Sequence, residues 1–330
     1  MKVTFPGFVD LQVNGFAGVD FNTPGHSVGQ INKAVAAMRA TGVTRCLPTI
    51  ITSSFEHFAA CAQTLLACDN LAIAGLHLEG PYISPQDGAR GAHPLAHVIP
   101  ASVEDFKRRQ EVANGRIRLV TLAPEVPGAL ALTAYLVEKN IRVAIGHTAA
   151  TPEQIHAGMR SGATLSTHLG NGCPQQMHSH DNVIWSQLAA DELTVSLIVD
   201  GHHLPPAVVK AMMRAKGLPR TILVTDATAA AAAPPGRYRL GDIEVERGMD
   251  GRVTQRGASN LAGSSLTLDN AVGNTVRFCG LTLEEVLPLA STQPARYLGS
   301  EPRGRVVAEW DPDQYRLTIC EVLLDPEASK

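Results

Sequence analysis

Four side chains that can bind a metal ion or move a proton each follow an apolar run of the chain. Glu79 comes after LAIAGLHL, His147 after RVAIG, His168 after ATLST and Asp226 after TILVT. A buried carboxylate is costly unless a positive partner holds it. Two neutral imidazoles and one carboxylate suit Zn²⁺ or a neighbouring transition metal and leave one coordination position open. The sequence therefore predicts that Glu79, His147 and His168 hold one divalent metal ion, with Zn²⁺ the expected ion.

Asp226 is the one of the four reactive side chains that is not among the three predicted ligands. A divalent ion lowers the pKa of water to about 7, and a carboxylate within reach can take the proton of the attacking water. We therefore expect Asp226 to be the catalytic base. His77 alternates to the same side of its run as Glu79. It lies ~6–7 Å further back along the strand, so we expect a supporting or core histidine there.

Eight short apolar or β-branched runs alternate with segments of helical periodicity. This alternation is typical of a parallel sheet that is covered on both faces. Eight such units fit a (β/α)8 TIM-like barrel, which typically needs ~250 residues. An open doubly wound sheet is the alternative, but no G-x-G-x-x-G turn follows the first run. The expected strands are 7–14, 43–50, 71–79, 117–124, 142–148, 163–169, 194–201 and 221–227.

The expected helices begin at capping residues and are followed by glycine or a new strand. Ser27 is a cap candidate for a helix over 27–42, and both SVED (102–105) and TPEQ (151–154) resemble capping boxes. A last helical segment over 281–299 closes the set of units.

Two segments do not fit the barrel pattern. Residues 236–257 are predicted to form a strand, a turn at MDG and a second strand, and the tail after Gly304 shows the same pattern with a turn at DPD. We expect a barrel domain over 6–300 with a β insertion at about 236–257. Residues 301–330, together with 1–5, are expected to form a small β annex.

The composition excludes several classes of protein. The chain has 330 residues, of which 45% are hydrophobic and 18% charged, and 28 Lys and Arg stand against 31 Asp and Glu. No basic run marks a nucleic-acid surface, and no apolar run approaches the ~20 residues of a membrane helix. The six scattered cysteines suit reduced thiols rather than a disulfide framework. These features, with an N-terminus MKVTFPGFVD that lacks a signal-peptide pattern, predict a cytoplasmic protein.

A barrel would gather the reactive side chains at one end. Side chains at the C-terminal ends of the strands line the active-site mouth of this fold. Gln12 and Asn14, at the end of the first expected strand, belong to the same mouth. These two amides either take part in the site or simply fill the barrel.

Stretches along nearly the whole chain carry a resemblance to one family. The chain resembles the N-acetylglucosamine-6-phosphate deacetylases of the amidohydrolase superfamily. The resemblance implies one tightly bound metal, since single-metal members have a similar pattern at Gln12 and Asn14, and a homodimer. The matching stretches are PGFVDLQVNGFAGVDF (6–21), GLHLEGPYISP (75–85), ARGAHP (89–94), AIGHT (144–148), THLGN (167–171), DGHHL (200–204), LVTDATAAA (223–231), LAGSSLTLDNAVGN (261–274) and TQPARYLG (292–299).

The resemblance also implies a role for each matching polar residue. It supports the metal ligands and the catalytic aspartate inferred above, and adds groups that bind the substrate. His93 is implied to help polarise the acetamide carbonyl, the backbone amides of Asn171 and Gly172 to approach the sugar or its phosphate, and His203 to bind the sugar.

One departure from the family pattern concerns the phosphate. The family has an arginine several residues after its Thr-His-Leu motif, and this arginine reaches the substrate phosphate across the dimer interface. No Lys or Arg occurs here from Asn171 to His203, so recognition of a 6-phosphate is in doubt. His178, His180 or Arg90 are the candidates to replace the missing arginine.

The sequence thus predicts a metal-dependent hydrolase that removes acetyl from an N-acetylamino sugar, with or without a 6-phosphate. Another amidohydrolase reaction, cyclic amide hydrolysis or deamination, is the first alternative, and release of acetate or ammonia distinguishes the two. A non-catalytic sugar-binding relative is the second alternative. The presence of a base beside the metal ligands argues against it.

Overall fold

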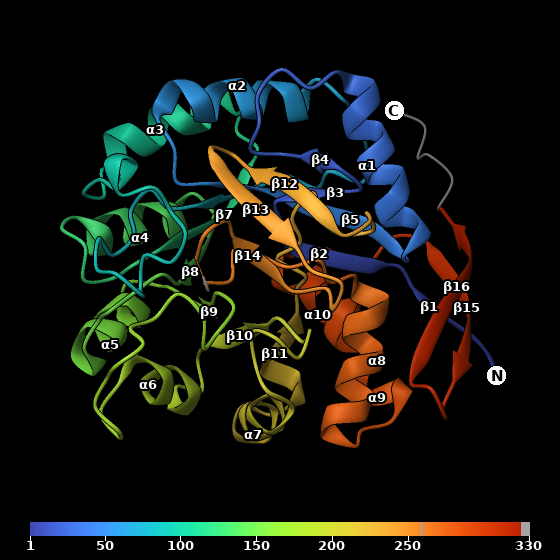
Figure 1. Cartoon of the computed structure of the whole chain (residues 1–330). Helices are drawn as coiled ribbons and strands as arrows, with labels where there is room; N and C mark the ends of the chain where they lie inside the picture. The colour runs from blue at the N-terminus through green and yellow to red at the C-terminus, as the bar shows by residue number, and fades with distance from the viewer. Residues whose placement is uncertain (259, 325–330) are drawn as a thin grey trace.

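The computed structural model describes residues 1–258 and 260–324 and contains the expected barrel (Figure 1). Its eight parallel strands lie in the order β11-β10-β9-β8-β7-β6-β5-β2. The backbone N–H of Asp226 donates to Gln12 O at 2.9 Å and that of Asn14 to Ala227 O at 2.7 Å, which joins the last strand to the first. The (β/α)8 prediction is confirmed. The strands are β2 (Phe8–Val13), β5 (Val43–Ile51), β6 (Leu76–Glu79), β7 (Ile117–Leu122), β8 (Arg142–Ile145), β9 (Leu165–Ser166), β10 (Thr194–Leu197) and β11 (Thr221–Leu223).

Several strands end earlier than the sequence predicts. The expected run 163–169 contains only the two strand residues of β9, and β8, β10 and β11 stop three or four residues before their expected ends. His147, His168 and Asp226 have φ angles of 49°, 31° and 50°. This left-handed backbone cannot continue a ladder. β8, β9 and β11 therefore end two or three residues before these reactive groups.

Helices follow the strands and cover the outside of the barrel. The predicted cap at Ser27 and the predicted capping box at Thr151 both form, and the cap at Ser27 is itself a capping box. At Ser102 the hydroxyl accepts from the Asp105 N–H. The prediction missed α8, although its apolar residues recur at helical spacing, and the expected helix 281–299 is two helices. The helices are α1 (Val28–Ala40), α2 (Phe55–Leu66), α3 (Val103–Val112), α4 (Ala129–Glu138), α5 (Pro152–Arg160), α6 (Val183–Ala189), α7 (Pro206–Lys216), α8 (Leu268–Cys279), α9 (Leu283–Ala290) and α10 (Thr292–Tyr297), with 3₁₀ turns at Leu95–His97 and Leu218–Arg220.

One buried apolar cluster fills the barrel and the layer between its strands and helices. All six cysteines are free, and three of them are buried in this core. None of the helices in the described ranges is long and apolar enough to cross a membrane.

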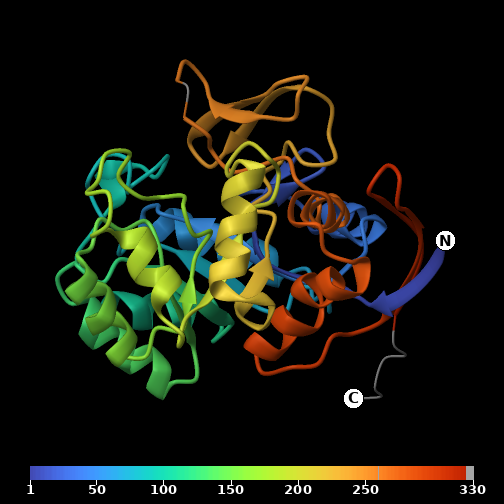
Figure 2. The same cartoon turned by 90° about the horizontal axis from the view of Figure 1, so that it is seen from below.

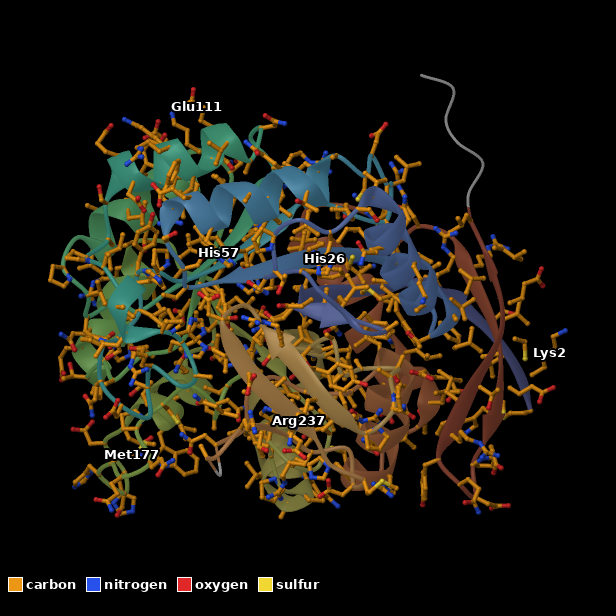
Figure 3. The ribbon with its side chains drawn as sticks, turned by 45° about the horizontal axis from the view of Figure 1, so that its top comes forward. Lys2, His26, His57, Glu111, Met177 and Arg237 are labelled. Carbon is orange, nitrogen blue, oxygen red and sulfur yellow. The ribbon has the colours of Figure 1, made fainter. Side chains whose placement is uncertain are left out.

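A small antiparallel sheet lies over the C-terminal end of the barrel (Figures 1 and 2). It consists of β12 (Gly236–Leu240), β13 (Ile243–Arg247) and β14 (Val253–Gln255), and we call it the flap. The prediction of a single hairpin here is wrong, because a tight turn at Gly241 and Asp242 adds a strand before the MDG turn. In Figure 3, Arg237 marks β12 and Met177 marks the loop before α6.

A buried contact anchors the flap to the barrel. A short hairpin of β3 (Gly15–Phe16) and β4 (Val19–Asp20) follows β2. The Asp20 carboxylate accepts a hydrogen bond from the backbone N–H of Gly241 at 2.7 Å. The underside of the flap packs its own apolar cluster, including Leu240 and Val245, against Ile51 at the end of β5.

The second small sheet confirms the predicted β annex. Its strands are β1 (Lys2–Pro6), β15 (Arg305–Asp311) and β16 (Arg316–Leu323), in the order β1-β15-β16. The N-terminal strand thus joins two strands from the far end of the chain at one side of the barrel (Figure 1). The last six residues of the predicted annex, 325–330, lie outside the described residues.

Two helical glycines test how tightly the annex is docked. An alanine Cβ at Gly273 in α8 would lie 2.1 Å from the backbone oxygen of Tyr315, whereas at Gly29 in α1 the nearest atom is 3.8 Å away. Gly273→Ala should therefore destabilise the fold by ~1–3 kcal/mol through overpacking. Gly29→Ala, the matched control, should be neutral or stabilising by up to ~1 kcal/mol. Chemical denaturation measures both, and equal effects of the two changes would contradict this packing.

Candidate metal centre and active site

The four reactive side chains lie together at the C-terminal end of the barrel. Glu79 is the last residue of β6, His147 and His168 follow β8 and β9 by two residues, and Asp226 follows β11 by three. All four side chains are buried. The turn out of each strand therefore brings residues that are up to 147 positions apart in the sequence into one cluster.

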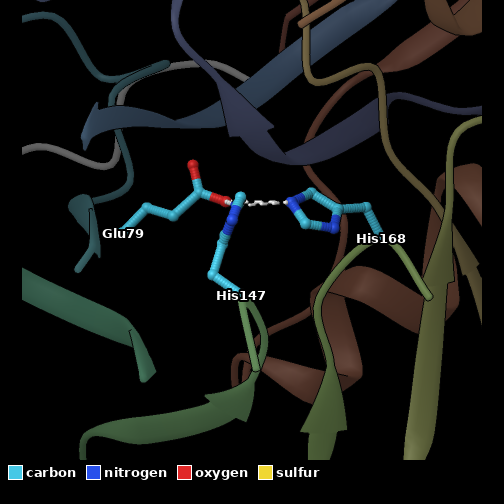
Figure 4. A group of neighbouring side chains, drawn as sticks. All are labelled: Glu79, His147 and His168. Carbon is cyan, nitrogen blue, oxygen red and sulfur yellow. Dashed lines mark hydrogen bonds and ion pairs between the residues drawn. The ribbon is translucent and has the colours of Figure 1, made fainter. Parts of the chain in front are cut away.

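Three of these side chains point their ligand atoms at one another (Figure 4). The Nε2 atoms of His147 and His168 lie 3.2 and 3.1 Å from Glu79 Oε1, and 3.1 Å from each other. One ligand atom from each residue falls within 4.8 Å of the others, and no other such group of His, Cys, Asp and Glu occurs within residues 1–258 and 260–324. Ligands of a tetrahedral ion with bonds of ~2.1 Å lie ~3.4 Å apart. The spacing therefore fits a small divalent cation.

Neighbouring backbone fixes the ring of His147. Its Nδ1 lies 3.0 Å from the carbonyl oxygen of Ala89, and a carbonyl only accepts, so Nδ1 carries the proton and Nε2 keeps its lone pair. A metal-binding histidine is held in the same way by a hydrogen bond to its other nitrogen. A Cβ at Gly172, where φ is +55°, would lie 2.8 Å from this Nδ1. Glycine is therefore required for the loop to approach the ring.

The electrostatics of the cluster also call for a positive centre. Burial alone would raise the pKa of Glu79, but its close contacts with His147 and His168 hold it well below its ordinary value. Burial would lower the pKa of His168, yet the hydrogen bond and charge of Glu79 raise it. Three acceptor atoms facing one another are stable only with a proton or a metal ion between them.

Two amides from the first strand hold Asp226. Its Oδ1 accepts from Asn14 Nδ2 at 2.7 Å and from Gln12 Nε2 at 3.1 Å, and the same Gln12 nitrogen donates to Glu79 Oε1 at 2.8 Å. Burial, and then the charge of Glu79, raises the pKa of Asp226 to about 6. Gln12 and Asn14 are thus placed to orient the carboxylate rather than only to fill the barrel.

His93 lies beside the cluster as a neutral imidazole. Its ring centre is 4.2 Å from that of His147. Burial, and then the nearby His147, holds the pKa of His93 well below its ordinary value. Its Nδ1 lies 2.8 Å from the Thr52 hydroxyl and accepts from the Thr52 N–H at 3.4 Å. The proton of the ring is therefore on Nε2, which becomes a hydrogen-bond donor.

A cavity of about 560 Å³ joins the cluster to solvent. His203 lies in its wall and is fixed by a hydrogen bond of 2.7 Å between its Nδ1 and Asp200 Oδ2. The flap and β5 add apolar groups, including Ile51 and Leu240. The predicted site residues that line the cavity are Asn14, Glu79, His93, His147, His168, Asn171, Gly172, His203 and Asp226, while Gln12 lies beneath them.

The cavity wall carries no fixed cation. None of its lining residues within the described chain is Lys or Arg. Arg90 turns away from it, since its guanidinium donates to the carbonyl oxygen of His93 at 2.7 Å and pairs with Asp87. His178 and His180 lie on an exposed loop and do not line the cavity. None of the three candidates takes the place of the missing arginine within this chain.

His77 belongs to the core beneath the site. Its ring lies between the hydroxyls of Thr49, at 3.2 Å, and Thr121, at 2.8 Å. Burial lowers its pKa to about 4, so the ring is neutral. It supports the barrel interior and does not reach the ligand atoms.

Sequence reasoning missed the partners that orient the reactive groups. Thr52, Asp200 and the carbonyl of Ala89 fix His93, His203 and His147 respectively. Thr52 follows β5 directly and Asp200 lies beyond β10. Thr52 and Asp200 could have been predicted as site residues from their position after strand ends. The Ala89 carbonyl has no side-chain signature.

Removal of any ligand side chain should abolish metal binding. Glu79→Gln, His147→Ala and His168→Ala each delete one of three protein ligands, so metal affinity should fall by more than the ~10–100-fold that loss of a supporting partner costs. Elemental analysis of the purified variants measures the metal content. His156→Ala, exposed on α5, is the matched control and should keep its metal. Full metal content in one of the three variants would remove that residue from the ligand set.

Comparison with known proteins agrees with this fold. Residues 3–314 match the model of the amidohydrolase family. An N-acetylglucosamine-6-phosphate deacetylase of Lysinibacillus sphaericus is 33% identical over 94% of this chain and 80% of its own. An N-acetylgalactosamine-6-phosphate deacetylase of Escherichia coli O157:H7 is 35% identical over 89% and 78%. The crystal structure of N-acetyl-D-glucosamine-6-phosphate deacetylase from Mycobacterium smegmatis superposes with a TM-score of 0.89 and 31% identity, over 98% of this chain and 86% of that one. The chain therefore belongs to the amidohydrolase family.

Proposed function

We propose that this protein is a metal-dependent deacetylase of N-acetylamino sugars. The observation that carries the proposal is the convergence of a three-ligand cluster and a separate carboxylate, Asp226, in one cavity. Relatives at 33–35% identity that are named as amino-sugar-phosphate deacetylases support the substrate class. The proposed ion is Zn²⁺, because two imidazoles and a carboxylate suit it.

A divalent cation held by Glu79, His147 and His168 would supply Lewis acidity to a carbonyl oxygen and lower the pKa of a water. Asp226 has one carboxylate oxygen tied by amides, and its other oxygen would take the proton of the attacking water. His93 Nε2–H would donate to the developing oxyanion. Protonated Asp226 would then deliver its proton to the amide nitrogen as the C–N bond breaks, which gives acetate and the free amine, because an amine leaves badly as an anion.

The remaining cavity residues are proposed to bind the sugar. His203, whose Nδ1–H donates to Asp200, would accept a hydrogen bond from a sugar hydroxyl at Nε2. Gly172 would approach the sugar or its phosphate with its backbone N–H, whereas the expected contact from Asn171 is not free to form, because its N–H already donates to His168 O at 3.0 Å. A homodimer and a cytoplasmic location remain predictions from the sequence.

Deamination and cyclic amide hydrolysis use the same fold and stay as alternatives. The crystal structure of 5-methylcytosine deaminase from Klebsiella pneumoniae superposes with a TM-score of 0.55 at 12% identity, which shows a common fold only. The metal-loaded protein should release acetate from N-acetylglucosamine or its 6-phosphate. Release of ammonia from an amidine or cyclic amide, with no acetate from either sugar, would replace the proposal.

Asp226→Asn tests the catalytic base. The amide keeps the shape of the carboxylate but cannot accept a proton, so kcat should fall by ~10²–10⁴ while the metal stays bound. Asp269→Asn, a half-buried aspartate of α8 outside the cavity, is the matched control and should keep wild-type turnover. If Asp226→Asn retains more than a tenth of the wild-type kcat, another residue is the base.

The preference for a 6-phosphate should be weak or absent. A charge-assisted hydrogen bond from arginine contributes about 1.5–3 kcal/mol, or roughly 10- to 100-fold in kcat/KM. No Lys or Arg within the described residues lines this cavity, so an anion would meet neutral donors such as the backbone amide of Gly172 and no fixed positive side chain. The measurement is kcat/KM for N-acetylglucosamine and its 6-phosphate at fixed pH and salt. A preference for the phosphate above a thousandfold would mean that another cation, such as one from a partner subunit, completes the site.

A further inference from the structure

The opposite end of the barrel carries a cluster of arginines. Arg45 lies near the start of β5, Arg116 directly before β7, and Arg303 before β15 of the annex. All three line one cavity of about 190 Å³. Parallel strands place this cavity at their N-terminal ends, whereas the reactive residues stand at the C-terminal ends. The arginine cluster therefore belongs to neither the metal centre nor the sugar cavity.

The charge of the cluster is not neutralised by ion pairs. Throughout residues 1–258 and 260–324, no carboxylate forms a salt bridge with Arg45, Arg116 or Arg303. Asp69 is the one carboxylate among the described lining residues, and its side chain is exposed. Three guanidinium groups thus face one carboxylate, which leaves a net positive cavity.

Arg45 is the most buried of the three arginines. Its Nε is shielded from solvent and has no hydrogen-bond partner among the described groups. Burial, followed by the charges of Arg303, Arg118 and Arg116, lowers the pKa of its guanidinium. A buried donor without an acceptor is destabilising, and a cluster of like charges adds to that cost.

The local backbone holds Arg116 and Arg118 against the chain that leads into β6. Arg116 anchors itself by donating to Ile73 O at 2.9 Å. Gly75, before β6, has a φ of +152°, and a Cβ there would lie 2.4 Å from Arg118 Cγ and 2.8 Å from Arg116 O. Any larger residue would separate the start of β7 from the chain that leads into β6. Glycine therefore allows the close approach that builds the positive cavity.

We propose that this cavity is a binding site for a small oxyanion of the phosphate class. Guanidinium groups match the oxygens of phosphate with paired, charge-assisted hydrogen bonds. A volume of about 190 Å³ suits a single phosphate or sulfate group, because sites for larger organic ligands typically have ~300–1,000 Å³. The bound anion would bridge β5, the start of β7 and the segment before β15, and so join the barrel to the annex. This site is independent of the proposed deacetylation.

The test uses the full, metal-loaded chain with inorganic phosphate and sulfate as probes, each compared with chloride at equal ionic strength. Titration calorimetry should give a saturable Kd below ~10 mM, and the apparent Tm should rise with phosphate, because a ligand that binds only the folded state stabilises it. Arg303→Gln and Arg45→Gln should each weaken binding by about tenfold or more. Arg303 is exposed, and within the described residues its side chain forms no salt bridge, so Arg303→Gln should stay folded even if Arg45→Gln does not.

Two matched variants separate an anion site from a general effect of charge. Arg214→Gln, exposed on α7 and away from the cavity, removes the same charge and should leave the Kd unchanged. Asp69→Asn removes the opposing carboxylate and should tighten binding. Turnover by Arg303→Gln should equal that of the wild type, since the two sites lie at opposite ends of the barrel. Equal responses to phosphate and chloride, or a phosphate Kd that Arg303→Gln and Asp69→Asn leave unchanged, would overturn the proposal.

Discussion

A carboxylate buried beside two imidazoles is the constraint on which the rest of the site depends. Glu79 is almost fully buried. The Nε2 atoms of His147 and His168 lie 3.2 and 3.1 Å from its Oε1. Desolvation opposes its charge, yet the imidazoles keep it ionised. Only a positive charge at the centre of the three atoms makes this arrangement favourable. The early strand ends, the left-handed residues and the glycine at 172 all serve to bring the three ligand atoms together.

The contacts that close the barrel also hold the proposed base. Gln12 and Asn14 link the first strand to Asp226 after the last strand through both backbone and side-chain hydrogen bonds. Just below, the Thr225 hydroxyl donates to the buried Asp10 carboxylate at 2.6 Å, and burial raises the pKa of Asp10 to about 7. Closure of the fold and orientation of the carboxylate therefore depend on the same few groups. A substitution that breaks these hydrogen bonds would lower both the stability of the fold and the turnover.

The strand-end pattern was enough to predict the barrel and to bring Glu79, His147, His168 and Asp226 together, because each follows an apolar run and parallel strands end at one face. Strand lengths were overestimated, since nothing in ATLSTHL reveals that His168 turns into left-handed backbone. The division of the first predicted flap strand into β12 and β13 was missed, although Gly241-Asp242 between two alternating runs is a hairpin signal. The roles of Thr52, Asp200 and the Ala89 carbonyl depend on contacts between distant segments. A pattern along one chain does not record such contacts.

Metal removal tests the central claim most directly. If a cation compensates the buried charge of Glu79, the chelated protein should have a lower apparent Tm, and one equivalent of Zn²⁺ per chain should restore both the Tm and the release of acetate. Calorimetric titration of the chelated protein gives the stoichiometry, and differential scanning gives the Tm on the same samples. An unchanged Tm after complete chelation, with acetate release intact, would contradict the account.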